Sequence, residues 1–222
     1  MSAYGLKEKH PASQRLIVLD FDGVLLDTER IALETWTVVL DEAGIDLPDG
    51  IPTHPDGTLA RDALNGALTS LLGQERARTS WDVFEHENQR RADREPLAPA
   101  TRSFLDHCRA GGHRLAVASG NAHSWVAGHL DRLGIRSHFA SVSCAGRGLA
   151  PKPAPDVYLA ALRHAGHTSH RALAVDDSFA GLRSAHTAGI PVAWFTARPA
   201  AARPPVPLAH RIQALDELNS IL

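Results

Sequence analysis

Two aspartates that stand two residues apart, Asp20 and Asp22, are the residues of this sequence best suited to do chemistry. They follow directly after residues 16–19, a short apolar run typical of a strand that is buried on both faces. Gly23 then permits a sharp turn. Carboxylates at the end of a buried strand are costly unless a metal ion or a hydrogen-bond network offsets their desolvation. We therefore interpret this pair as reactive groups rather than as structural ones.

Three further sets of polar residues follow short apolar runs later in the chain. These sets are Ser119-Gly120-Asn121, Lys152 between two prolines, and Asp176-Asp177. Open parallel sheets bind ligands in the crevice outside the carboxyl ends of their strands. We therefore expect all three sets to meet Asp20 and Asp22 at one edge of a sheet.

Phosphoryl transfer is the chemistry that suits this combination. An aspartate can attack phosphorus and become an acyl phosphate, while a second one protonates the leaving oxygen and later activates water. Several carboxylates at one point need a cation, because like charges raise each other's pKa, and oxygen ligands with room for water suit Mg²⁺. A lysine can hold the charge of the transferring group. The Ser119 hydroxyl and the amides at the start of the next helix can hold phosphate oxygens.

The elements that must position these residues are strands that alternate with helices. Repeated strand–helix units predict an α/β fold, a doubly wound (Rossmann-like) parallel sheet with helices on both faces. The expected strands are residues 16–19, 115–118, 138–144, 173–175, 191–196 and, more weakly patterned, 211–213. The expected helices between them are residues 101–110, 122–133, 155–165 and 178–188.

The stretch after the first strand breaks this alternation. It contains helical patterns only, over residues 29–43, 59–72 and 80–94. We therefore predict a helical cap domain at residues 28–95, inserted into a core domain formed by residues 15–27 and 96–222. Residues 1–14 are polar and are expected to be a flexible tail.

Composition excludes several other classes of protein. The 222 residues carry a net charge of −2, which gives no electrostatic grip on nucleic acid. No apolar run approaches the roughly 20 residues that a membrane helix needs. The two cysteines lie far apart, which favours a reducing compartment, and we expect a cytoplasmic protein. High usage of Ala, Arg and Pro suggests a bacterial source. The 13 histidines are scattered without a metal-ligand spacing, so we interpret them as surface residues.

The motifs together resemble those of the haloacid dehalogenase (HAD) superfamily of hydrolases. Residues 20–29 resemble its first motif, Ser119 the second, Lys152 with Pro153 the third, and Asp176-Asp177-Ser178 the fourth. The likeness spans residue 15 to the C-terminus. The position of the insert resembles that of the helical cap in the branch that contains phosphoglycolate phosphatase and β-phosphoglucomutase.

The resemblance implies a role for each acidic group and for the lysine. Asp20 would be the nucleophile and Asp22 the general acid and base. Mg²⁺ would be bound by the Asp20 carboxylate, the Asp22 backbone carbonyl and Asp177. Asp176 stands where the branch usually has glutamate, and its shorter side chain leaves open whether it binds the metal directly or through water. Lys152 would pair with the nucleophile and the phosphate.

The resemblance also implies where the substrate binds. Ser119 and the amides of Gly120 and Asn121 would hold its phosphate. Substrate choice would lie in the cap, where position alone suggests Arg61, Asn65, His54 and Trp81.

Three functions remain open, and the first is preferred. It is a Mg²⁺-dependent phosphatase, a monomer, that acts on a small phosphorylated metabolite. The second is a phosphomutase of the β-phosphoglucomutase type, which is disfavoured because Ala32 stands where the mutase has a histidine. The third is a non-catalytic member that binds a phosphorylated ligand, which the intact set of acidic residues disfavours.

Overall fold

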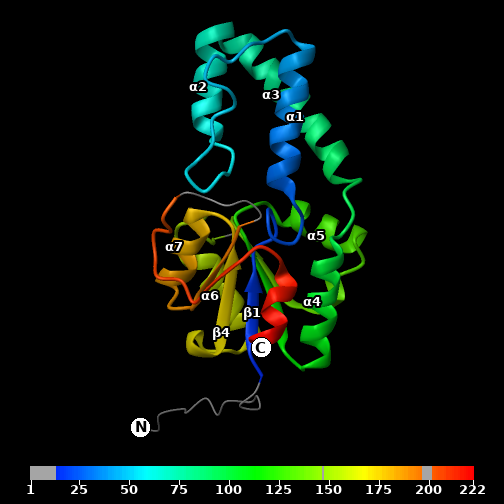
Figure 1. Cartoon of the computed structure of the whole chain (residues 1–222), viewed down its shortest axis with the longest axis vertical. Helices are drawn as coiled ribbons and strands as arrows, with labels where there is room; N and C mark the ends of the chain where they lie inside the picture. The colour runs from blue at the N-terminus through cyan, green and yellow to red at the C-terminus, as the bar shows by residue number, and fades with distance from the viewer. Residues whose placement is uncertain (1–13, 147, 197–201) are drawn as a thin grey trace.

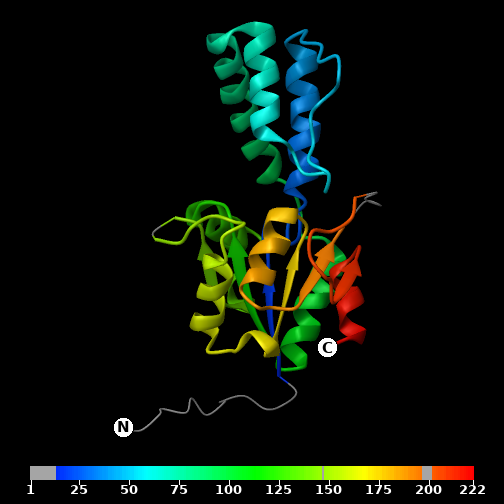
Figure 2. The ribbon, with the colours of Figure 1, turned by 90° about the vertical axis from the view of Figure 1, so that its left-hand side faces the viewer.

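The computed structural model describes residues 14–146, 148–196 and 202–222. The predicted tail therefore lies outside the described residues, except for its last residue, Gln14. Figures 1 and 2 show two parts, a sheet with helices on both faces and a group of helices that stands beyond the carboxyl ends of the strands.

The sheet has six strands, all parallel, in the order β3-β2-β1-β4-β5-β6. The strands are β1 (Leu16–Leu19), β2 (Arg114–Ser119), β3 (Phe139–Cys144), β4 (Ala172–Asp176), β5 (Val192–Phe195) and β6 (His210–Ile212). This order confirms the predicted doubly wound sheet. Strand β1 lies in the middle, paired with β2 on one side and β4 on the other.

The apolar run of β1 is continuous because helices cover both faces of the sheet. Ile17 and Leu19 pack in one core cluster with α4 (Pro99–Ala110) and α5 (His123–Arg132). Leu16 and Val18 pack in the other, with α6 (Asp156–Ala165) and α7 (Phe179–Thr187). Short 3₁₀ turns complete this part, at η1 (Arg136–His138), η2 (Ser169–Arg171) and η3 (Leu215–Ser220).

The three remaining helices are α1 (Thr28–Glu42), α2 (Arg61–Leu72) and α3 (Gln74–Ala92). Helix α3 begins six residues before the predicted start at Ser80. Its first turns carry polar helix formers, with only Ala77 buried before Ser80, so they lack the apolar periodicity that marks a helix. Gly73, with a φ of +80°, ends α2 and starts α3 directly.

These three helices form a bundle with an apolar core of its own. Trp36 stacks on Phe84 with ring centroids 4.5 Å apart, and Leu64 and Leu68 are fully buried beside them. No helix of the described residues is long and apolar enough to cross a membrane.

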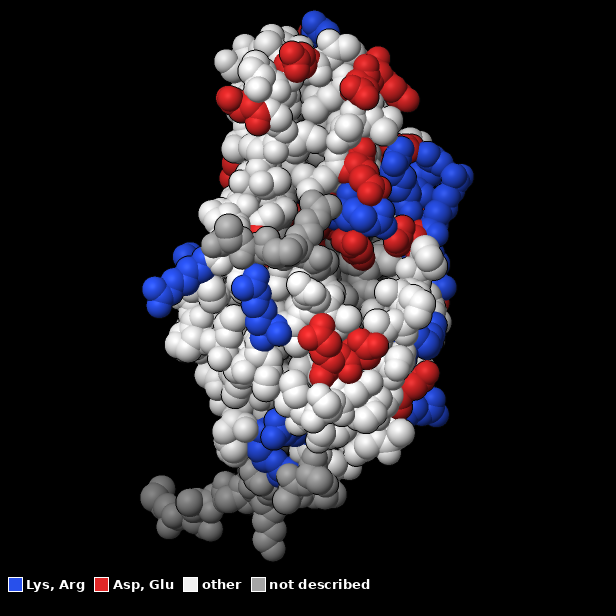
Figure 3. Space-filling view, in the orientation of Figure 1, with Lys and Arg blue, Asp and Glu red and all other residues white. Residues whose placement is uncertain are grey.

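Ion pairs tie together the two connections between the bundle and the sheet. Arg30 contacts Asp27 at 3.2 Å and Glu34 at 2.9 Å, and it reaches Glu95 in the second connection at 2.5 Å. Arg132 of α5 donates to the backbone carbonyl of Glu95 at 3.0 Å. Figure 3 shows basic and acidic side chains gathered side by side where the bundle meets the rest of the molecule.

The substitution Leu68→Ala tests the predicted division into two domains. Removing most of this fully buried side chain should lower the free energy of unfolding of the bundle by about 2–5 kcal/mol, because the cavity left behind closes only in part. Hydrogen exchange should accelerate in α1–α3 while β1 and β4 keep their protection. Leu71→Ala, at a side chain 53% exposed in the same helix, is the matched control and should change stability by less than about 0.5 kcal/mol. Equal acceleration in the sheet would contradict the division.

Candidate active site at the carboxyl edge of the sheet

The predicted polar groups line a cavity of about 730 Å³ between the sheet and the helical bundle. The residues from the strand ends that line it are Asp20, Asp22, Ser119, Gly120, Asn121, Lys152, Asp177 and Ser178. Asp176 lies beneath them and is fully buried. The bundle supplies the opposite wall through α1, α3 and the loop before α2. The topology thus brings together the residues that sequence reasoning assigned to one sheet edge.

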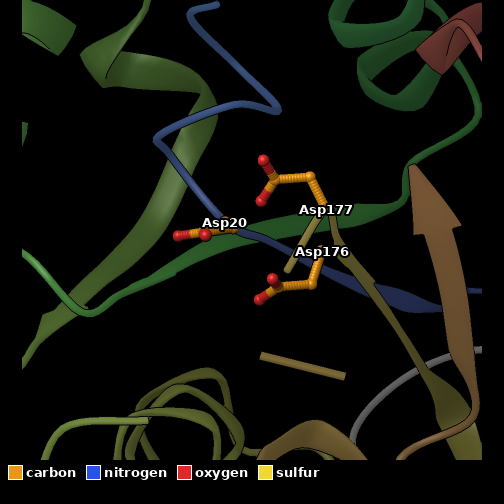
Figure 4. A group of neighbouring side chains, drawn as sticks. All are labelled: Asp20, Asp176 and Asp177. Atoms are coloured by element: carbon orange, nitrogen blue, oxygen red, sulfur yellow. The ribbon is translucent and has the colours of Figure 1, made fainter. Parts of the chain in front are cut away.

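Three carboxylates form a tight cluster at this edge (Figure 4). Asp20, Asp176 and Asp177 each offer an oxygen, and these atoms lie within 4.8 Å of one another. Adjacent strands position them, since Asp20 directly follows β1 and Asp176 ends β4. The Asp20 amide continues the ladder by donating to the Val175 carbonyl at 2.9 Å. Such a cluster of oxygen ligands suits a hard divalent cation.

Asp176 is satisfied by four donors. One carboxylate oxygen accepts from Lys152 Nζ at 2.7 Å and from the Tyr158 hydroxyl at 2.6 Å. The other accepts from the backbone and the hydroxyl of Ser178, at 3.0 and 2.9 Å. Burial and the nearby Asp176 raise the pKa of Tyr158, so its hydroxyl stays a donor. These contacts make Asp176 an anchor for Lys152; its ligation of a metal stays a prediction.

Lys152 joins the two buried carboxylates. Its ammonium lies 3.0 Å from Asp20 and 2.7 Å from Asp176, and its side chain is 7% exposed. Burial disfavours the charged form, but the two carboxylates outweigh it and raise the pKa of Lys152 above its ordinary value. The lysine is therefore a fixed positive charge beside Asp20.

One lysine does not neutralise the cluster. Burial raises the pKa of Asp20 to about 8, against the opposing effect of Lys152 and with further increases from Asp176 and Asp22. Burial, followed by the charges of Asp176 and Asp20, also raises the pKa of Asp177 well above its ordinary value. A cation bound between these carboxylates would favour their charged forms and so would lower the pKa of both groups.

Asp177 is the carboxylate that is free to bind a cation. Among the described residues, no donor makes a hydrogen bond to its side chain, although it lies in the cavity wall. Gly23 makes room for it, because a Cβ at this glycine would lie 1.9 Å from Asp177 Oδ2. Gly23 also has a φ of +76°, which favours glycine at the turn after the first motif. The residues present therefore fit a Mg²⁺ site.

The Asp22 side chain points toward α5 and the loop that precedes it. Its two oxygens accept hydrogen bonds from Asn121 Nδ2 at 2.8 Å and from Trp125 Nε1 at 3.0 Å. Ser119 is almost fully buried, and its hydroxyl accepts from the Asn121 amide at 3.0 Å. The loop after β2 is thereby held against the first motif.

The four cap residues suggested from position lie in two different places. His54 and Arg61 line the cavity. Asn65 and Trp81 line neither this cavity nor a neighbouring one of about 540 Å³, and instead the Trp81 indole donates to Asn65 Oδ1 at 2.9 Å.

Sequence reasoning missed several residues of the site. Glu29 lines both cavities, and one of its carboxylate oxygens accepts from the Leu59 amide at 3.0 Å. Asp56 accepts from the Phe179 amide at 2.7 Å and so connects the bundle's loop to α7. Glu29 was detectable as an acid within the first motif, whereas Asp56 carries no local signal because its partner is 123 residues away.

Comparison with known proteins defines the class. Residues 17–195 match the sequence profile of the haloacid dehalogenase-like hydrolases, and the chain belongs to this family. Protein CbbY of Cupriavidus necator is 32% identical over 201 residues, which cover 79% of this chain and 75% of that protein. The phosphorylated carbohydrates phosphatase of Thermotoga maritima is 25% identical over 179 residues, covering 78% and 81%.

A solved structure agrees in fold. A Thermotoga maritima protein provisionally named a β-phosphoglucomutase superposes with a TM-score of 0.77 at 20% identity, over 94% of this chain and 98% of that one. Together, these comparisons confirm the predicted family and the predicted enzyme class, a phosphatase-type hydrolase.

The substitution Gly181→Ala tests the packing beneath the cluster. A Cβ at position 181 would lie about 1.9–2.0 Å from the Asp176 carboxyl atoms, so the Asp176 side chain must move away from Lys152. We expect the free energy of unfolding, measured with urea, to fall by roughly 1–3 kcal/mol. Gly128→Ala is the matched helical control, with nothing within 4 Å of the added carbon. It should be neutral or stabilising by up to about 1 kcal/mol, and a similar gain for Gly181→Ala would contradict the geometry.

The raised pKa of Asp20 predicts how stability depends on pH without divalent cations. Between the ordinary value of 3.8 and about 8, the folded state keeps a proton that the unfolded state releases. The contribution of Asp20 to the stability of the fold is therefore fully present below pH 3.8 and is lost as the pH rises toward about 8. Asp20→Asn removes the loss, so in EDTA its stability relative to wild type should increase from pH 5 to pH 8. Parallel thermal unfolding curves across this range would refute the assignment.

Proposed function

We propose that the protein is a Mg²⁺-dependent phosphatase that hydrolyses a small phosphorylated metabolite through an aspartyl-phosphate intermediate on Asp20. The observation that carries this proposal is the Asp20 carboxylate, which lies 3.0 Å from Lys152 and within the cluster that contains Asp177. A nucleophile beside a fixed positive charge, at the wall of a cavity large enough for a metabolite, is the arrangement that phosphoryl transfer needs.

The donor set supports a magnesium ion at this point. The Asp20 and Asp177 carboxylates and the Asp22 backbone carbonyl would hold it, with Asp176 behind them. When bound, Mg²⁺ neutralises charge on the cluster and on the phosphoryl oxygens.

The proposed reaction has two steps that this chain's residues perform. Asp20 attacks phosphorus, the bond to the leaving oxygen breaks, and Asp22 donates its proton to that oxygen. Water then attacks the aspartyl phosphate, gives its proton to Asp22, and releases phosphate and a free Asp20. Lys152 holds the charge of the transferring group, and Ser119 binds a phosphate oxygen with help from the loop amides.

We assign the bundle of residues 28–95 the role of a cap domain. It forms the wall of the cavity that faces the acidic cluster, and its cover limits the access of water during transfer. His54 and Arg61 are retained as specificity residues because they line this wall. We further propose that the protein is a monomer in the cytoplasm, a compartment that suits two free, buried cysteines.

A phosphomutase is the weaker alternative. Ala32 lines the cavity at the position where the mutase would carry a histidine, so no imidazole is available there. A mutase would convert a hexose 1-phosphate to the 6-phosphate in the presence of a bisphosphate activator, whereas a phosphatase releases inorganic phosphate.

Hydrolysis of p-nitrophenyl phosphate tests the proposal. Wild type should release nitrophenol with Mg²⁺, and EDTA should abolish the release. Asp20→Asn should lower kcat by about a thousandfold or more, because the covalent step requires the carboxylate. Asp82→Asn, on the exposed face of α3, is the matched control and should retain activity. Release that needs no Mg²⁺, or that survives Asp20→Asn, would refute the mechanism, and a binder without turnover would refute the function.

A further inference from the structure

We propose that Trp125 is a positioning residue for Asp22. Its indole N–H, together with the Asn121 side chain, fixes the Asp22 carboxylate at the cavity wall, where that carboxylate exchanges a proton with the leaving oxygen. This inference rests on the proposed function and adds to it a residue that no motif identifies.

The hydrogen bonds to Asp22 hold both ends of its carboxylate. Trp125 Nε1 contacts Oδ1 at 3.0 Å, and Asn121 Nδ2 contacts Oδ2 at 2.8 Å. One donor on each oxygen defines the plane of the group and leaves further lone pairs free. All three residues line the cavity that contains Asp20 and Lys152. The fixed carboxylate can therefore reach a substrate bound there.

The indole is itself held in place by ring contacts. Trp125 is half-buried and packs edge-on against His129, with ring centroids 4.4 Å apart. His129 is buried and stacks on Phe21 at 5.9 Å. Phe21 is fully buried between the two aspartates of the first motif. The donor on α5 is thus anchored to the same segment that it positions.

The kind of donor differs between the two aspartates of the first motif. Asp20 pairs with the charged Lys152, whereas Asp22 accepts from two neutral groups. An indole N–H only donates and exchanges no proton at ordinary pH, so it orients Asp22 without competing for the transferred proton. This suits a proton carrier better than an ion pair would.

The consequence depends on the leaving group. When the phosphorus–oxygen bond of an alkyl ester breaks, the oxygen departs as a strong base and needs the proton of Asp22. A nitrophenolate is a weak base that departs without one. Misplacing Asp22 should therefore slow the alkyl ester much more than the aryl ester.

The experiment compares kcat/KM, which reports the steps through transfer to Asp20, for β-glycerophosphate and p-nitrophenyl phosphate. Trp125→Phe keeps an aromatic ring against His129 and removes the N–H. It should lower kcat/KM about tenfold or more for the alkyl ester, part of what a general acid contributes, and less than about threefold for the aryl ester. Asp22→Asn should show the same selectivity with a larger loss.

Asp82→Asn, on the exposed face of α3 and outside both cavities, is the control. It should leave the ratio of the two kcat/KM values unchanged. In ¹H–¹⁵N NMR spectra, Asp22→Asn should shift the Trp125 indole signal and leave that of Trp81 in place.

The outcomes separate the two proposals. If the wild type is active and Trp125→Phe lowers kcat/KM equally for both esters, or for neither, the role of Trp125 is overturned while the proposed function stands. An unmoved Trp125 indole signal in Asp22→Asn overturns the contact. A wild type that hydrolyses neither ester overturns the proposed function together with this role.

Discussion

The desolvation of three carboxylates at one sheet edge is the constraint on which the rest of the structure depends. Asp20, Asp176 and Asp177 bring their oxygens within 4.8 Å of one another, and a single lysine stands among them. The pairing of β1 with β4 makes this approach possible. Gly23 and Gly181 leave the space that the side chains occupy, since a Cβ at either would overlap a carboxylate.

The three carboxylates meet this constraint in different ways. Asp176 is satisfied by protein donors from α6, from Ser178 just before α7 and from the loop of Lys152. Asp20 shares that lysine and keeps a raised pKa, because one ammonium does not offset burial beside other acids. Asp177 is left for an external cation. The three carboxylates thus differ in pairing, from the fully hydrogen-bonded Asp176, through Asp20, which we propose as the nucleophile, to Asp177, which we propose as a metal ligand.

Much of the fold and the centre of the site could be predicted from the sequence. The apolar run before Asp20 identified β1, and the later runs identified the other strands to within one or two residues at each end. Strand ends of a parallel sheet share one edge, so Lys152 and Asp177 could be assigned to the site of Asp20 without knowing any distance. The polar start of α3 was missed because its residues bury almost nothing.

The sequence by itself determined the positions of the strands, the family and the residues that converge, because these depend on local patterns along the chain, whereas the order of the strands in the sheet came from the structure. Tertiary structure alone decided which partner each side chain has. Trp125 meets Asp22 across 103 positions, and Asp56 meets Phe179 across 123, contacts that no local pattern encodes. It also decided that Arg61 faces the cavity while Asn65 and Trp81 face each other, since packing within the bundle fixes the rotation of its helices.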